Sequence, residues 1–77
     1  MDPGIPIFIN RREFATPRPE MSGREILGLA GLGPDHDLFL LDGEGDRTGG
    51  TPIGLDQVIT LHPGEHFRAI PGNRNFG

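Results

Sequence analysis

Short apolar runs alternate with Gly, Pro and charged residues along the whole chain. The run at residues 5–9 predicts a first strand, residues 10–11 predict a tight turn, and residues 12–16 predict a second strand that completes an N-terminal hairpin. Pro17 and Pro19 end this hairpin, because a residue that precedes proline favours extended backbone. The first quarter of the chain is therefore predicted to be a hairpin and an extended connection.

A helix signal follows at Ser22. Ser22 is a favoured N-cap residue, and Glu25 three positions later completes the pattern of a capping box. Met21, just before the cap, can pack on Ile26 as a hydrophobic staple. The apolar stripe that supports the helix has nearly helical spacing and consists of Ile26, Leu27, Leu29, Ala30 and Leu32.

The same segment carries its own stop signals. Gly31 or Gly33 can end the helix, and Pro34 lies just beyond them. The predicted helix is therefore short, about ten residues, and depends on tertiary packing for its stability.

Strand and turn patterns fill the rest of the chain. The predicted elements are, in chain order, a polar turn at 35–36, a largely buried strand at 38–41, a Gly-rich acidic loop at 42–50, an irregular segment or short edge strand at 51–55, a short strand or turn at 58–61, a turn at 62–65 and a last strand at 66–70.

This order of elements predicts an α+β fold, with one helix packed across one face of a mixed sheet of four to five strands. The first and last strands can pair in parallel at the sheet centre, with the helix in a right-handed crossover. The layout is the ubiquitin-like β-grasp, predicted for residues 1–71, with a flexible C-terminal tail at 72–77.

Composition restricts the classes of function. A chain of 77 residues makes one small domain, and without cysteine it can have no disulfide, thiolate metal site or cysteine nucleophile. A small domain without disulfides is typical of the reducing cytoplasm. No stretch resembles a signal peptide or a membrane span, so we expect a cytoplasmic protein with no membrane partner. The net charge of −4 and the lack of a basic stripe argue against nucleic acid as a partner.

Lysine is absent, and all the basic residues are arginine. An isopeptide-linked polymer of this domain therefore cannot form. A polymer would need the amino group of Met1, or ester links to the hydroxyl groups of Ser22, Thr16, Thr48, Thr51 or Thr60.

The tail after Ile70 has no pattern that would bury it, and the chain ends on Gly77. Seven extended residues reach roughly 23 Å, at about 3.3 Å each. Glycine has no Cβ, so its carboxylate can pass through a narrow enzyme channel. This layout is typical of a protein whose own C-terminus is the reactive group, although an ordinary frayed end has the same composition.

Three stretches together resemble a known family. The helix segment at 21–31, the segment Asp35-His36-Asp37-Leu38-Phe39-Leu40, and Leu61-His62-Pro63-Gly64-Glu65-His66-Phe67 closing on Pro71 are similar to the bacterial multiubiquitin-type domain. The resemblance covers about residues 5–71. It implies a ubiquitin-like modifier from bacterial operons that also encode an activating enzyme, a carrier enzyme and a processing metallopeptidase, some of them linked to antiphage defence.

The resemblance also implies a mechanism for the tail. The activating enzyme would adenylate the Gly77 carboxylate, and the carrier enzyme would pass it to a protein target, while the modifier supplies no catalytic residue and no cofactor. Arg74, Asn75 and Phe76 would be the residues by which the tail is recognised. Two departures stand out: family members often carry tandem domains, and ubiquitin ends in Gly-Gly where this chain has Phe76-Gly77.

Two other functions stay open. A non-covalent adaptor would bind partners by its sheet face, for which Phe14, Ile53 and Phe67 are candidates, with core packing as the other interpretation. A sulfur carrier would end in a thiocarboxylate, but such chains usually finish in Gly-Gly, so Phe76 counts against it.

Metal and phosphate motifs are incomplete. Asp42, Glu44 and Asp46 alternate as in an EF-hand loop, but Arg47 and Ile53 stand where Gly and Glu are required. The glycines of the same loop match neither phosphate-loop pattern.

Zinc and serine-type catalysis have little support either. The histidines His36, His62 and His66 could meet at a zinc ion, although isolated surface residues explain them as well. Ser22 is accounted for as an N-cap, so no enzyme activity is predicted.

Overall fold

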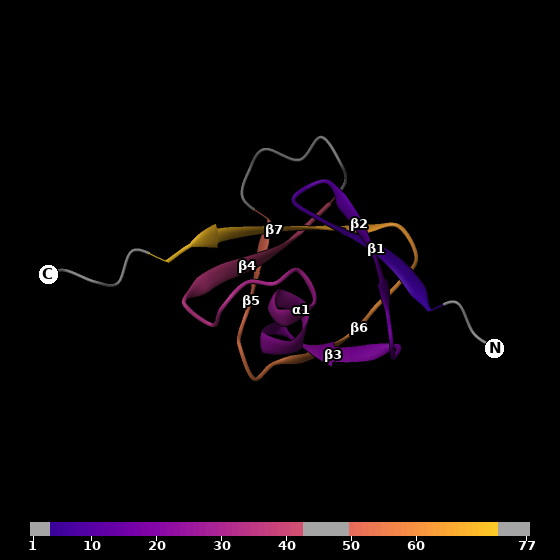
Figure 1. The fold of residues 1–77 in the computed structure, drawn as a ribbon, viewed down its shortest axis with the longest axis horizontal. Helices are drawn as coiled ribbons and strands as arrows, with labels where there is room; N and C mark the ends of the chain where they lie inside the picture. The colour runs from indigo at the N-terminus through magenta and orange to yellow at the C-terminus, as the bar shows by residue number, and fades with distance from the viewer. Residues whose placement is uncertain (1–3, 43–49, 73–77) are drawn as a thin grey trace, which may run out of the picture.

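The computed structural model describes residues 4–42 and 50–72, in which one helix crosses one face of a mixed five-stranded sheet (Figure 1). The elements are β1 (Ile5–Ile9), β2 (Arg12–Thr16), β3 (Glu20–Ser22), α1 (Gly23–Leu29), β4 (His36–Leu41), β5 (Thr51–Ile53), β6 (Val58–Thr60) and β7 (Glu65–Pro71). The large sheet has the order β2-β1-β7-β4-β5, and β3 pairs with β6 in a small second sheet. The predicted α+β, β-grasp fold is confirmed.

The first and last strands of the chain lie side by side at the sheet centre. They run parallel, with Ile7 opposite Glu65 and Ile9 opposite Phe67, as the sequence predicts. The other strand pairs of the described residues are antiparallel. Because β7 is the middle strand, the whole sheet is assembled around the segment that leads to the C-terminal residues.

The β1–β2 turn consists of Asn10 and Arg11, both with left-handed backbone (φ 53° and 71°). Two residues with positive φ are the mark of a type I′ hairpin, whose twist matches that of the strands. The register Ile9 to Arg12 closes the hairpin directly after this turn. The predicted turn is therefore confirmed, with an unusual residue at its second position.

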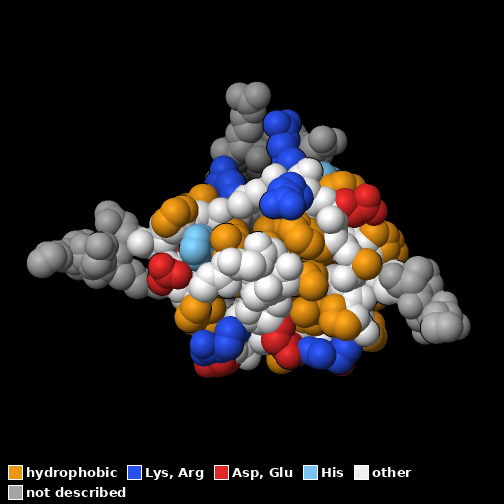
Figure 2. All heavy atoms as spheres, viewed as in Figure 1, with side chains coloured by type: hydrophobic (Ala, Val, Ile, Leu, Met, Phe, Trp, Pro, Cys, Tyr) orange, Lys and Arg blue, Asp and Glu red, His pale blue; other side chains and the backbone are white. Residues whose placement is uncertain are grey.

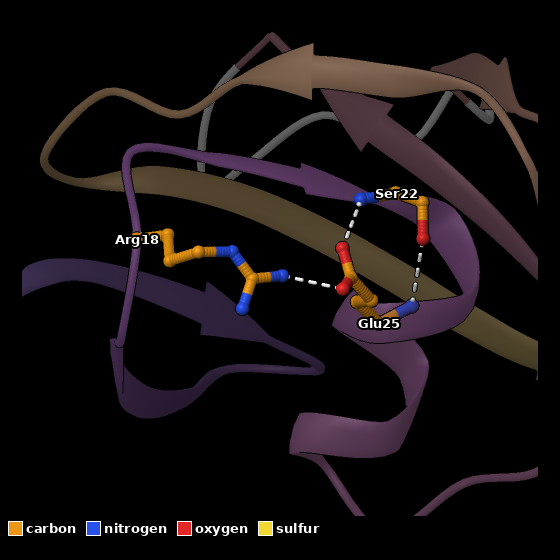
Figure 3. A network of polar contacts seen from close by, with 3 residues as sticks. All are labelled: Arg18, Ser22 and Glu25. Atoms are coloured by element: carbon orange, nitrogen blue, oxygen red, sulfur yellow. Dashed lines mark hydrogen bonds and ion pairs between the residues drawn. The ribbon is translucent and has the colours of Figure 1, made fainter.

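Helix α1 begins as its capping chemistry predicts. The Ser22 side chain accepts a hydrogen bond from the Glu25 backbone N–H at 3.2 Å, and the Glu25 carboxylate accepts one from the Ser22 backbone N–H at 2.9 Å. The Arg18 guanidinium donates to the other Glu25 oxygen, so one carboxylate holds the helix start and the preceding connection together (Figure 3).

The helix ends earlier than predicted. It has seven residues instead of about ten, because Gly31 adopts a left-handed conformation (φ 76°) directly after the C-cap residue Ala30. The Gly31 N–H then donates to the Gly28 carbonyl at 3.0 Å and the Leu32 N–H to the Leu27 carbonyl at 2.9 Å, which is a Schellman motif. Of the two glycines considered, Gly31 is the stop.

One strand was missed, and one further expectation was wrong. Strand β3 was not predicted, because three residues after a proline-rich connection show no alternation; it forms because Met21 lies opposite Ile59 of β6. His36 was predicted in a turn but is the first residue of β4, opposite Pro71 at the end of β7.

The core lies between the large sheet and α1. Its buried apolar residues are Ile7, Ile9, Met21, Ile26, Leu27, Leu38, Ile53, Leu61, Phe67 and Ala69. The helix start is also docked on the loop after β5, since the Gly23 and Arg24 N–H groups donate to the Gln57 and Leu55 carbonyls. A Cβ atom on Gly23 would lie 2.3 Å from the Gly54 carbonyl oxygen, so this contact requires glycine.

The capping box predicts a dependence of stability on pH. Hydrogen bonding from the Ser22 backbone N–H, and then from Arg18, lowers the pKa of Glu25 below its ordinary 4.5. A lowered folded-state pKa stabilises the fold above the unfolded value, and this contribution is lost as pH falls through the folded value. Thermal unfolding of the wild type should therefore shift to lower temperature between about pH 5 and pH 3 more than that of Glu25→Gln.

Glutamine is the matched control, because it can still bond the Ser22 N–H but carries no charge. A difference in melting temperature between the two proteins that stays constant with pH would contradict this assignment.

Candidate partner-binding surface

Burial along β7 separates the two faces of the sheet. Phe67 and Ala69 are buried on the helix side, whereas His66 and Arg68 are half-buried and Ile70 is 40% exposed. Successive residues of a strand point to opposite faces, so these three residues lie on the face that α1 does not cover. We call this side the outer face.

Cross-strand pairing extends the outer face over three strands. Residues directly opposite each other in a ladder share a face. Pairing of Phe8 with His66, of Phe39 with Arg68 and of Asp37 with Ile70 therefore places six residues on it: Phe8, Asp37, Phe39, His66, Arg68 and Ile70.

Aromatic rings and the guanidinium group of Arg68 meet on this face. The Phe8 and His66 rings stack with centroids 4.6 Å apart and an angle of 10° between their planes. The Arg68 guanidinium carbon lies 5.9 Å from the Phe39 ring centroid, and Arg68 Nε is buried with no hydrogen-bond partner among the described residues. The outer face can thus offer apolar ring surface and a positive group to one partner.

The three residues that the sequence offered for a sheet-face interface lie elsewhere. Phe67 and Ile53 are buried in the core, and Phe14 is half-buried and packed against it. Their alternative interpretation, core packing, is confirmed. The outer-face residues could have been found from strict alternation, because Phe8 lies between the apolar residues Ile7 and Ile9, and Arg68 between Phe67 and Ala69.

The end of β7 is held from both sides. On one side, the Asn10 side chain donates to the Ala69 carbonyl and accepts from the Ala69 N–H, each at 3.0 Å. On the other, the Gly72 N–H donates to the Asp35 carbonyl at 2.8 Å. The strand ends at one extremity of the fold, opposite the start of β1 (Figure 1). The predicted tail residues Arg74, Asn75, Phe76 and Gly77 lie outside the described residues.

The histidines have separate surroundings. His36 Nδ1 lies 3.1 Å from an Asp35 carboxylate oxygen, and His62 Nδ1 lies 3.3 Å from one of Glu65, while His66 stacks on Phe8. No group of three or more potential metal ligands occurs among residues 4–42 and 50–72.

The acidic loop considered for calcium or phosphate falls on residues 43–49, outside the described part of the chain. Within that part, no helix has the length and apolar character needed to cross a bilayer.

Comparison with known proteins gives one family match and one partial relative. A family model described as multiubiquitin matches residues 5–71. Isoprenyl transferase 1 of Streptomyces coelicolor is 36% identical over 62 residues, which cover 70% of this chain and 22% of the relative. The chain therefore matches about a fifth of that relative's length. No solved structure matches the chain.

Proposed function

The chain belongs to the multiubiquitin family, and from this membership we propose that it is a ubiquitin-like protein modifier, conjugated through Gly77 by partner enzymes. The partners would be an adenylating (activating) enzyme, a carrier enzyme and a processing metallopeptidase in the cytoplasm, and the resemblance links some systems of this kind to antiphage defence. The similarity to an isoprenyl transferase involves about a fifth of that protein and supports no transferase activity.

The position of β7 carries the proposal. The middle strand of the sheet ends at Pro71, and its end is fixed by Asn10 and by the Gly72–Asp35 hydrogen bond. The residues that follow toward Gly77 thus start from a rigid point at one extremity of the body. A fixed starting point lets a partner enzyme locate the C-terminal carboxylate by docking on the folded domain.

The proposed chemistry needs no catalytic group from this chain. The Gly77 carboxylate attacks the α-phosphate of ATP and displaces pyrophosphate, which gives an acyl-adenylate. A cysteine thiolate of the enzyme displaces AMP to form a thioester, and an amine or hydroxyl of the target displaces the thiol. Target attachment to this same domain is restricted, because it has no lysine and the Thr16 hydroxyl is buried and donates to the Ile5 carbonyl.

Deletion of Phe76-Gly77 tests the proposal. We expect the deletion to abolish conjugates formed with the activating and carrier enzymes, because it removes the reacting carboxylate, while the circular dichroism spectrum and melting temperature stay unchanged. Denaturing gels and mass spectrometry of the products are the measurements. Conjugates that persist after the deletion would rule out attachment through Gly77.

The outer face favours a second candidate, a non-covalent adaptor. Its rings and Arg68 are available to a partner whether or not the C-terminus reacts. Phe8→Ala removes the ring that stacks on His66 and leaves Phe39 and Arg68 in place, so it is the matched control. An adaptor should lose its partner with this substitution and keep it after the tail deletion. A modifier should form the thioester with this substitution and fail to form it after the tail deletion.

A further inference from the structure

Arg11 occupies a backbone position that suits glycine better. It has φ 71° at the second position of the β1–β2 turn, where a side chain is strained and glycine is not. Arg11 is exposed, and its side chain has no hydrogen-bond or ion-pair partner among residues 4–42 and 50–72. The described fold therefore gains nothing from this side chain that would offset the strain.

The turn is fixed beside the end of β7. The Asn10 backbone N–H donates to the Phe67 carbonyl at 2.9 Å, and the Asn10 side chain bonds both backbone groups of Ala69. Ala69 is two residues before the end of the strand at Pro71, a distance of about 7 Å along extended backbone. Arg11 is thus held next to the point where the C-terminal segment leaves the body.

The described arginines fall into two groups. Arg18 and Arg24, near the helix start, pair with Glu25 and Asp56. Arg11, Arg12 and Arg68, on the hairpin and β7, have no ion pair within the described ranges, and we call these three the arginine edge. Figure 2 shows basic side chains gathered over the top of the molecule, where Figure 1 places β1, β2 and β7.

Two members of the arginine edge are already positioned by aromatic rings. The Arg12 guanidinium carbon lies 5.7 Å from the Phe14 ring centroid, and that of Arg68 lies 5.9 Å from the Phe39 centroid. The side chains of Arg12 and Arg68 point to opposite faces of the sheet, so one lies on each side of the β1–β2 turn. A guanidinium that lies over a ring keeps its in-plane N–H groups available for a carboxylate and loses little freedom when it binds one.

We propose that the arginine edge, with Arg11 at its tip, docks carboxylates of the activating enzyme beside the C-terminal segment. The inference rests on the proposed function and names the contact that orients the domain. An acidic protein surface fits better than nucleic acid, because three arginines on a chain of net charge −4 would neutralise few phosphates.

Arg11→Gly tests the inference, because it should raise the thermal stability of the domain and weaken its docking on the activating enzyme. Relief of the backbone strain should raise the melting temperature. Loss of the charge should raise the KM for the modifier in ATP–pyrophosphate exchange about three- to fivefold, as expected for an exposed ion pair, with kcat unchanged. The KM of the wild type should also rise more steeply with salt than that of the variant.

Arg11→Lys and Arg11→Asn are the controls. Lysine keeps the charge and should keep a KM close to that of the wild type, whereas asparagine tolerates the backbone and should behave as glycine does in the exchange assay. Arg11→Gly combined with Arg68→Gln should raise KM more than tenfold, roughly twice the single effect in free energy.

The outcomes separate this inference from the proposed function. Exchange by the wild type with an unchanged KM in Arg11→Gly would overturn the arginine edge and leave the modifier function standing. No exchange by the wild type would overturn both. Binding of a short DNA oligonucleotide that Arg11→Gly abolishes, with KM unchanged, would reassign the edge to nucleic acid and so also overturn the proposal.

Discussion

Truncation of Phe67 to alanine is expected to lower the free energy of unfolding by about 3–5 kcal/mol. Phe67 is 1% exposed and belongs to the middle strand, where the core of the sheet meets the helix. A domain of 77 residues has a total stability of about 4–12 kcal/mol, so the loss is a large share of it. Urea unfolding followed by circular dichroism should show a much lower midpoint, or no folded baseline at all.

Phe39→Ala is the matched comparison for this prediction. The same side chain is removed from a neighbouring strand, but from the outer face, where it is half-buried under Arg68. We expect a loss of about 1 kcal/mol or less, because little area is uncovered and no cavity is left. Equal losses for the two variants would show that the outer face is packed as tightly as the core, and that it is no partner surface.

The parts of the fold that sequence predicted depend on local chemistry. The capping box of Ser22 and Glu25 involves residues three apart, and the turn at Asn10 and Arg11 lies between two short apolar runs. Both motifs are complete within one segment, so no tertiary contact is needed to identify them. The order of the elements then leaves few ways to bury the apolar residues, of which the β-grasp is one.

The parts that sequence missed depend on contacts between distant segments. Strand β3 exists because Met21 meets Ile59, and three residues carry too little pattern to show this in advance. His36 is drawn into β4 by its pairing with Pro71. For the candidate surface, apolar character alone favoured Phe14, Ile53 and Phe67. These residues face the core, because alternate residues of a strand point to opposite faces and these three lie at positions on the helix side.

The roles proposed for Arg74, Asn75, Phe76 and Gly77 remain predictions. They rest on the chemistry of a terminal glycine and on family membership, and those residues lie outside the described part of the chain. What the structure adds is the geometry just before them: a central strand that is clamped at Ala69 and Gly72.

Asn10→Asp is expected to destabilise the domain by about 1–3 kcal/mol at neutral pH. The Asn10 amide imitates a peptide group, since it donates to the Ala69 carbonyl and accepts from the Ala69 N–H, and it continues the parallel ladder one step past Ile9. A carboxylate can accept from the N–H but cannot donate to the carbonyl. The ionised oxygen would face the carbonyl oxygen at hydrogen-bonding distance and repel it.

Protonation supplies the decisive control. A protonated carboxyl in the variant can donate to the Ala69 carbonyl, so folding favours the neutral form and raises the pKa of the introduced group above its unfolded value. Since the folded state then binds the proton more tightly, the destabilisation should shrink as pH falls below that raised pKa. Urea unfolding at several pH values, compared with the wild type, measures this difference directly. Protonation of Glu25 in acid lowers the stability of both proteins equally. The difference between their free energies of unfolding therefore reports on position 10 alone.

In the same experiment, Asn10→Gly separates the contribution of the side-chain hydrogen bonds to stability from that of the backbone conformation. Glycine accepts the positive φ of this turn but makes neither bond to Ala69, so its loss of stability should be independent of pH. A pH-independent loss in Asn10→Asp as well would show that the amide donates nothing to Ala69. If stability is regained in acid by Asn10→Asp and not by Asn10→Gly, the side chain at position 10 of the first hairpin fixes the end of the last strand. The same side chain would then set where Arg11 stands relative to the residues leading to Gly77.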